Sequence, residues 1–323
     1  MEDNGKRANN QSLHPDMFLL QTYLEKNNHR LWTFIAFFLV YLFILVENLI
    51  LIMLIVRERQ LHKPVYIFLC NLATIDIVGS SATVPRALYS LVVTNVISFP
   101  ICVVQVFFLH FYATFQVYLF ALMAIDRYVA IHYPLRYNVL ITNSRAHKVN
   151  VLVISSAILI VLGFVFLLLP LTFCEQKLLP NSFCSHVGLF KLACDDTTFN
   201  SVYGTIITLL NTGVSLIIIA WSYACILWIC LRQRQHSDSI NKALHTCVTH
   251  FICLLAFFIP GIFYIIFLRI GKNYSISNYL QAIFDLMLFV MPSFCNPLIY
   301  GLRMMEIRQV FSNMFGKCFS CRR

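Results

Sequence analysis

Charged side chains are scarce in this chain. Asp, Glu, Lys and Arg make up 12% of its 323 residues, whereas 59% of the residues are hydrophobic. Soluble globular domains carry about 25% charged residues, so this composition excludes an ordinary soluble protein. Four long stretches, at 101–125, 149–174, 197–231 and 243–268, contain no charged residue at all. Since about 20 apolar residues can cross a bilayer as a helix, these stretches predict membrane spans.

Three further apolar stretches contain single acids, namely Glu47, Asp76 and Asp285. A charge at the bilayer centre costs roughly 2.5–3.5 kcal/mol on insertion scales, so these acids are candidates for functional groups. The predicted fold is an all-α membrane protein, a bundle of seven transmembrane helices with a short amphipathic helix after the seventh. The approximate helices are 31–56, 64–90, 99–131, 147–170, 198–231, 241–268 and 276–302, in one receptor domain at 31–302.

The net charge of +10 is unevenly distributed along the chain. Most Lys and Arg residues fall in alternate connections and in the tail at 303–323, which therefore face the cytoplasm by the positive-inside rule. This distribution indicates topology, with anionic lipid and a cytoplasmic partner as secondary interpretations, and it does not indicate nucleic acid. Residues 1–30 then form an exterior tail with a glycosylation site at Asn10. That tail shows no cleavable signal peptide, so the first helix acts as the targeting signal.

The twelve cysteines divide by their place along the chain. Cys102, Cys174, Cys184 and Cys194 fall at the predicted exterior, where two disulfides are expected and three pairings are open. Cys318 and Cys321 follow the last helix and are either palmitoylated or free thiols.

Two motifs lie at the predicted cytoplasmic ends of helices. In MAIDRYVAIHYPLRY, at 123–137, Asp126 can hold Arg127 in a local ion pair, although a snorkelling Arg would give the same pattern. NPLIYGLR, at 296–303, places an Asn-Pro break and a Tyr near the end of the seventh helix. Asn48 and Asp76 supply polar groups at mid-membrane depth, where they are expected to hydrogen-bond one another.

Together these motifs resemble the rhodopsin-like G-protein-coupled receptors. LHKPVYIFLCNLATID at 61–76, KLACDDT at 191–197, SYACI at 222–226 and KALHTCVTH at 242–250 are similar to motifs of the olfactory receptors. QVFFLHF at 105–111 and the stretch at 258–260 resemble the class I, or fish-like, branch. The chain departs from the family pattern at Glu47, Gln116, His132 and His245; Gln116 replaces a Glu that would strengthen a sodium site.

The resemblance implies roles for particular residues. The coupling and activation residues would be Asp126, Arg127, Tyr128, Tyr223, Asn296, Pro297 and Tyr300. The ligand site would be lined by His110, Ala113, Thr114, Val117, Thr208, Asn211, Phe258, Gly261, Ile265 and Arg269. The implied disulfides are Cys102–Cys184 and Cys174–Cys194. His110 can instead be a buried His bonded to a backbone carbonyl, and Arg269 can instead be an exposed loop residue.

The expected function is that of an odorant receptor of the plasma membrane. A small odorant, with an organic acid favoured, would bind in the outer half of the bundle and activate a stimulatory heterotrimeric G protein, raising cAMP. Arrestin and a receptor kinase are further expected partners, and no cofactor or metal is expected. No nucleophile–base pair is seen, so an enzyme is not expected. The alternatives are a non-olfactory rhodopsin-like receptor, disfavoured for amines by Leu109, and a transporter or channel that uses the three intramembrane acids.

Overall fold

The computed structural model describes residues 17–20, 30–174, 177–179, 181–232, 247–261, 263 and 278–320. Six described helices are long and apolar enough to cross a membrane, and a seventh apolar helix, Cys247–Gly261, is shorter in its described part. The long helices are α1 (Arg30–Arg57), α2 (Pro64–Val92), α3 (Phe99–His132), α5 (Asn143–Leu168), α7 (Thr198–Arg232) and α9 (Asn278–Arg303). The shorter ones are η1 (Arg59–Leu61), α4 (Tyr137–Leu140), α6 (His186–Phe190) and α10 (Met305–Ser320).

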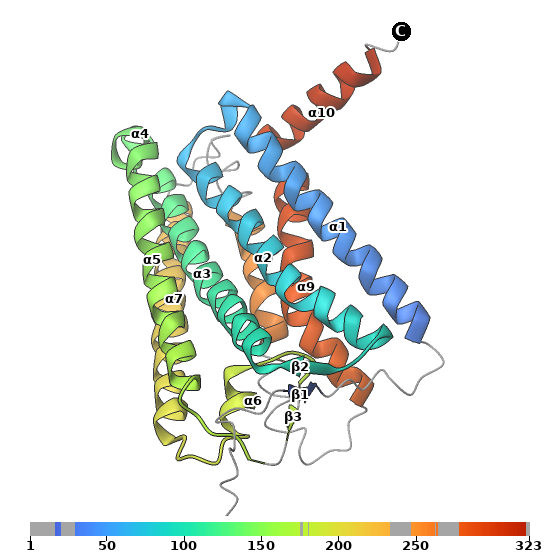
Figure 1. Ribbon diagram of the computed structural model, residues 1–323. Helices are drawn as coiled ribbons and strands as arrows, with labels where there is room; N and C mark the ends of the chain where they lie inside the picture. Colours follow the sequence, from blue (N-terminus) through green and yellow to red (C-terminus); the bar gives the residue numbers. More distant parts are fainter. Residues whose placement is uncertain are drawn as a thin grey trace, which may run out of the picture.

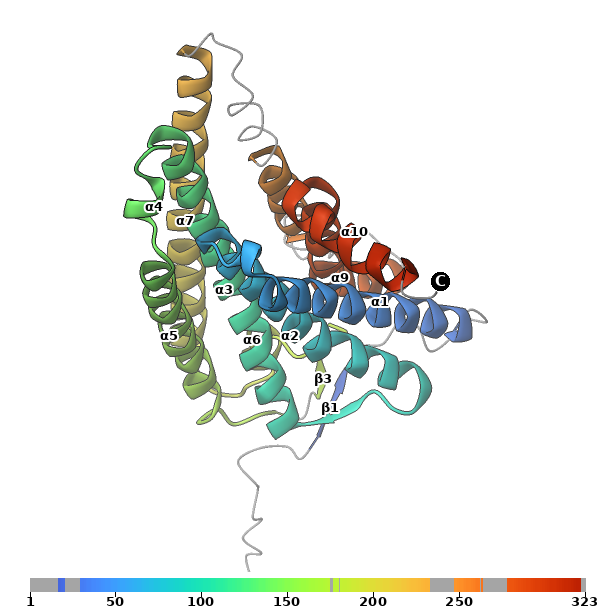
Figure 2. The same ribbon diagram turned by 90° about the horizontal axis from the view of Figure 1, so that it is seen from above.

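The long helices form a bundle with α3 at its centre. Helix α3 contacts α2, α5 and α7, and it lies between the α5–α7 pair and the α1, α2 and α9 group (Figure 1, Figure 2). Its inward side chains, among them Tyr112 and Phe120, are almost fully buried. Gly79 of α2 allows Tyr112 to pack closely, because a Cβ at Gly79 would collide with the Tyr112 ring.

The predicted boundaries agree with the described helices to within a few residues, except in α5. That helix begins at Asn143, earlier than the predicted residue 147, because the Thr142 side chain accepts a hydrogen bond from the Arg145 backbone N–H at 3.3 Å. It ends at Leu168, shortly before Pro170, because a proline has no backbone N–H to continue the helical hydrogen bonds. The predicted sixth helix is described only at Cys247–Gly261 and at residue 263; its predicted start at 241–246, its predicted end at 264–268 and the connection before it lie outside the described residues.

One end of the bundle carries a small sheet that the sequence did not predict. Strand β1 (Met17–Leu20) lies between β2 (Val96–Ser98) and β3 (Leu178–Leu179), antiparallel to the first and parallel to the second. Phe18 and Leu20 are fully buried in a cluster that includes Cys102 and Cys184. Part of the N-terminal tail is therefore an ordered element of this end, called the sheet end below (Figure 1).

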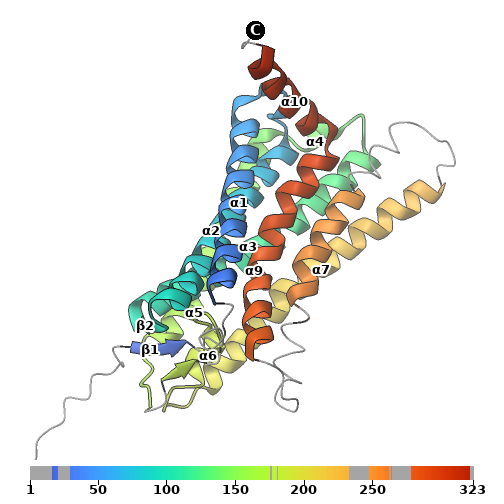
Figure 3. The same cartoon turned by 90° about the vertical axis from the view of Figure 1, so that its right-hand side faces the viewer.

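The opposite end carries α10, which leaves α9 at an angle (Figure 3). Ile307 and Val310 are buried against the main core, whereas Met305 and Phe311 are exposed. The amphipathic helix predicted after the seventh thus packs only part of its apolar side against the bundle. Glu306 of α10 accepts hydrogen bonds from Lys63 at 2.9 Å and from the Tyr66 hydroxyl at 2.6 Å, so α10 is tied to the start of α2.

Candidate functional site

The α10 end of α3 contains the predicted ion pair. Arg127 Nη2 lies 2.6 Å from Asp126 Oδ2, and Arg127 Nε donates to the same oxygen at 3.1 Å. The other carboxylate oxygen of Asp126 accepts a hydrogen bond from the Tyr137 hydroxyl at 2.7 Å, a partner that sequence reasoning missed. Tyr137 lies in the short helix α4, where burial raises its pKa and the Asp126 charge raises it further. Asp126 thus holds Arg127 on one side and α4 on the other.

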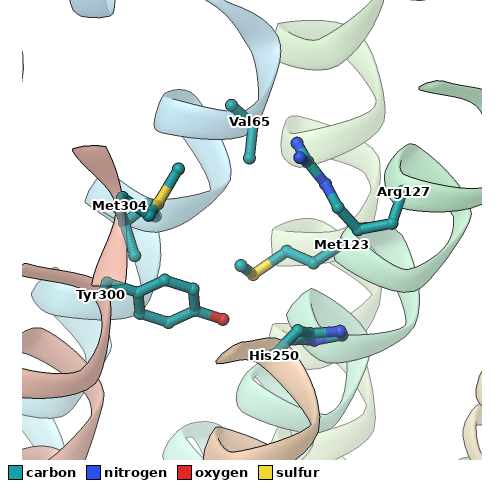
Figure 4. Close-up of a pocket in the computed structure, with 7 residues that line it drawn as sticks. Val65, Met123, Arg127, His250, Tyr300 and Met304 are labelled. Carbon is teal, nitrogen blue, oxygen red and sulfur yellow. The ribbon is translucent and has the colours of Figure 1, made fainter. Parts of the chain in front are cut away.

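A small cavity lies directly beside Arg127. It is lined by Val65, Leu69, Met123, Arg127, His250, Tyr300 and Met304, from α2, α3, the Cys247–Gly261 helix and the end of α9. Its volume of about 10 Å³ is enough for roughly one water molecule. The Tyr300 hydroxyl and the Met123 side chain point into this space (Figure 4). The site around Arg127 is therefore nearly closed.

Tyr223 connects α7 to the Cys247–Gly261 helix at the same end. Its hydroxyl lies 3.1 Å from the Cys247 carbonyl oxygen, to which it donates, and 2.9 Å from His250 Nδ1. Tyr128 packs on Trp221 of α7 and stacks with His132. The structure thus brings Arg127, Tyr223 and Tyr300 to one end of the bundle.

A polar cluster surrounds Asp76 in the middle of the bundle. Asp76 is fully buried and accepts hydrogen bonds from Asn296 Nδ2 at 2.9 Å, from Ser293 Oγ at 3.3 Å and from Gln116 Nε2 at 3.4 Å. Gln116 therefore donates a hydrogen bond where a Glu would bring a second negative charge. Pro297 follows Asn296 inside α9.

The predicted hydrogen bond between Asn48 and Asp76 was wrong. Asn48 donates instead to the backbone carbonyls of Ile44, at 2.9 Å, and Ser293, at 3.0 Å. Ser293 lies between the two residues, because its own hydroxyl donates to Asp76. Helix α9 thus bridges α1 and α2 through one serine.

The predicted ligand residues on α3 share one helix face near the sheet end. His110 stacks on Phe164 of α5 with ring centroids 4.4 Å apart, and Val117 is buried. Thr114 is half-buried, whereas Ala113 is exposed, although it lies on the same face. Exposure of Ala113 means that neighbouring helices do not fill this part of the face.

The remaining predicted ligand residues differ from one another in exposure and in the contacts that they make. Asn211 of α7 accepts a hydrogen bond from the Tyr118 hydroxyl at 2.5 Å, so it joins α7 to α3, whereas Thr208 is exposed. Phe258 contacts Phe257, and a Cβ on Gly261 would come within 3.8 Å of Leu288 on α9. Ile265 and Arg269 lie outside the described residues, as do Asn10, His245 and Cys321; the side chain of Cys318 is also not described.

His186 is a site residue that sequence reasoning missed. It begins α6 in the long loop, is 1% exposed, and contacts Phe164 edge-on with ring centroids 5.0 Å apart. Burial lowers its pKa, and His110, with its ring centroid 6.1 Å away, also lowers it, to about 3 in total. His186 is therefore neutral at physiological pH. Only its position two residues after Cys184 could have pointed to it.

Both implied disulfides are present. Cys102–Cys184 joins α3 to the long loop, and Cys174–Cys194 closes the loop on itself. Thr172 donates to Asp195 from its backbone N–H at 2.5 Å and from its hydroxyl at 2.8 Å, beside the second disulfide. These bonds lower the pKa of Asp195, which keeps its carboxylate ionised. The loop is thereby held across the sheet end.

The bundle and the placement of these residues define a class of protein. The crystal structure of squid rhodopsin superimposes with a TM-score of 0.71 at 16% sequence identity, covering 89% of this chain and 80% of the rhodopsin chain. At that identity the likeness shows the fold alone, which is a bundle of seven transmembrane helices like that of rhodopsin.

The sequence comparisons identify the family within that class. The family described as "Olfactory receptor" matches residues 37–318. Human olfactory receptor 52B2 is 35% identical over 304 residues, covering 94% of this chain and 93% of the relative. Human olfactory receptor 52B6 is 37% identical over 289 residues, covering 88% and 85%. The chain belongs to the olfactory receptor family, whose members are multi-pass membrane receptors and not enzymes.

Proposed function

We propose that the chain is a class I-like odorant receptor of the plasma membrane, with its sheet end outside and its α10 end in the cytoplasm. A small odorant binds between α3, α7, the Cys247–Gly261 helix and α9, and the receptor activates a stimulatory heterotrimeric G protein that raises cAMP. Arrestin and a receptor kinase would bind the same cytoplasmic end.

The observation that carries this proposal is a pair of interactions that hold the α10 end closed, namely one ion pair and one hydrogen bond. Asp126 holds Arg127 within α3, and Tyr223 holds α7 to the Cys247–Gly261 helix. Arg127 lines a cavity that holds about one water, and so does His250, whose Nδ1 lies 2.9 Å from the Tyr223 hydroxyl. An outward movement of the Cys247–Gly261 helix would break the Tyr223–Cys247 bond and open that cavity. Arg127, a rigid and permanently charged donor, would then be free for the carbonyls of a G-protein segment.

Ligand binding acts on this equilibrium by population shift. An odorant that binds the open state more tightly than the closed state shifts the equilibrium toward the open state. The size of the shift is limited by the difference between its affinities for the two states. The unfilled face of α3 near Ala113 supports a small-molecule site there, since such sites are concave and mostly apolar with few polar groups. His110 and Thr114 supply the polar groups on α3, and His186 supplies one from the loop.

The proposed ligand class is an organic acid. Arg269, at the sheet end of the sixth helix in sequence, would bind the carboxylate through its planar guanidinium. His186 does not replace it, because a neutral imidazole offers a hydrogen bond but no positive charge. The acid therefore depends on Arg269 for charge recognition.

A cAMP screen in transfected cells tests the function, using organic acids, aldehydes, amines and steroids. For an activating acid, Arg269→Ala should weaken potency by about 10- to 100-fold, because a charge-assisted bond contributes roughly 1.5–3 kcal/mol. The matching ester should be barely affected, and Arg269→Lys should recover part of the response to the acid.

Equal losses for acid and ester would contradict the acid site but not the receptor function. Odorant-evoked current without cAMP would contradict coupling to a stimulatory G protein and favour a channel.

A further inference from the structure

Asp285 is a buried acid that the proposed signalling mechanism does not use. It lies in α9 near the sheet end, is 1% exposed, and has apolar neighbours along the helix. Within the described part of the chain, no Lys, Arg or His forms an ion pair with it. A buried carboxylate is stable only when hydrogen bonds compensate for its lost hydration. The partner that supplies such a bond therefore identifies its role.

The partners of Asp285 lie in the long loop. Ser182 N–H donates to Asp285 Oδ2 at 2.9 Å, and Ser182 is itself 5% exposed. A hydrogen bond to an ionised acceptor is roughly twice as strong as one between neutral groups. The Asn181 side chain hydrogen-bonds the same carboxyl group, so two consecutive buried loop residues hold Asp285.

The next two loop residues extend the contact toward the bundle centre. The Phe183 ring meets Phe289, one turn from Asp285 on α9, edge-on with centroids 5.3 Å apart. The Cys184 backbone N–H donates to Gln105 Oε1 at 2.9 Å, and Cys184 is disulfide-bonded to Cys102 of α3. Gln105 in turn donates to the Ala82 carbonyl of α2 at 2.7 Å.

The segment Ser182–Cys184 thus spans the sheet end from α9 to α3, with unequal attachments. Its α3 side is covalent, through the disulfide, whereas its α9 side depends on one hydrogen-bonded acid and one ring contact. An apolar residue in place of Asp285 would leave the buried Ser182 N–H without an acceptor, so the α9 side would detach first.

We propose that Asp285 is a positioning residue that latches the long loop onto α9 and so closes the sheet end over the ligand site. The latch is independent of G-protein coupling and can be tested without an odorant, so its failure and that of the proposed function are distinguishable. The proposal predicts that the accessibility of position 182 to a reagent depends on whether residue 285 offers a hydrogen-bond acceptor.

The test places a reporter thiol at Ser182→Cys in the full-length receptor. A cationic, membrane-impermeant methanethiosulfonate reagent is applied to intact cells and to opened membrane fragments, so the result does not depend on orientation. The reporter should react slowly in the parent chain and at least tenfold faster with Asp285→Leu. Asp285→Asn keeps one oxygen acceptor without the charge, so its rate should fall between them.

Two controls separate the latch from general loosening. Asp196→Asn removes another acid of the sheet end, whose hydrogen bonds in the described part of the chain go only to Thr198 of its own segment, and should leave the reporter rate unchanged. A second reporter, Ile97→Cys, replaces a residue of β2 that is 3% exposed and should stay slow with Asp285→Leu.

Equal rates for Ser182→Cys with and without Asp285→Leu would overturn the proposal, as would acceleration at both reporters. If Asp285→Leu is retained inside the cell, the reporter rates are compared in opened membranes instead. The Ser182→Cys reporter must in any case react faster with Asp285→Asn than in the parent chain.

Discussion

In the proposed mechanism, single residues at the α10 end of α3 hold the closed state. Asp126 uses one oxygen for Arg127 and the other for Tyr137, so a single carboxylate restrains both the charged donor and the connection after α3. Arg127 is too far from the sheet end to touch an odorant, and its role can therefore be separated from ligand binding.

Arg127→Ala should abolish odorant-evoked cAMP while surface expression and odorant binding remain close to those of the parent. The physical reason is the loss of the charged donor in the cavity beside Tyr300. The measurements are cAMP, surface labelling and binding of the same odorant. A normal cAMP response from a well-expressed Arg127→Ala receptor would contradict the coupling role.

Tyr137→Phe is the informative companion, since it removes one bond to Asp126 and leaves Arg127 in place. Such a bond contributes about 0.5–1.5 kcal/mol, so basal cAMP should rise by roughly 2- to 10-fold. Tyr133→Phe is the matched control, because Tyr133 is 43% exposed and makes no bond to Asp126 in the described structure.

At the scale of elements, β1 and the two disulfides organise the sheet end. Strand β1 joins the α2–α3 connection to the long loop, since Leu20 N–H donates to the Asn95 carbonyl at 3.0 Å and Leu19 N–H donates to the Lys177 carbonyl at 2.8 Å. Successive side chains of a strand point to opposite faces, so Leu20 is buried while Leu19 is 41% exposed.

This alternation allows a matched pair of substitutions. Leu20→Asn should destabilise the receptor and reduce surface expression, because burying a leucine contributes about 1.5–3 kcal/mol and an unpaired amide adds a further cost. Leu19→Asn should be nearly neutral. Thermal inactivation of the purified receptor gives the direct comparison, and equal losses in the two variants would mean that β1 does not pack as described.

A variant that lacks Cys102 or Cys184 should be retained inside the cell. A disulfide of this kind contributes roughly 2–5 kcal/mol, and its loss frees the loop from α3. Surface labelling measures the effect, and the double substitution should be no worse than either single one. Full surface expression of both single variants would show that the disulfide is dispensable.

For the whole molecule, the proposed orientation places the sheet and the long loop outside. Excess Lys and Arg lie in the segments of the α10 end, as expected for a cytoplasmic face. The two disulfides lie at the opposite end, which suits an oxidising exterior.

An epitope tag at the N-terminus should be detected on intact cells, and a C-terminal tag only after permeabilisation. Glycosidase should increase the electrophoretic mobility of the parent chain but not of Asn10→Gln, because glycosylation occurs on the lumenal side. Detection of the C-terminal tag on intact cells would reverse the topology.

The sequence by itself determined the membrane spans, because the cost of charge in hydrocarbon leaves long uncharged stretches that are visible without a structure. It also indicated Asp126 with Arg127, since neighbours in sequence at a helix end are necessarily neighbours in space. Only the tertiary structure decided contacts between distant segments: Ser293 between Asn48 and Asp76, β1 between two loops, and Asp285 beneath Ser182. Those contacts depend on the rotation and depth of each helix in the bundle, which packing sets and local sequence pattern does not.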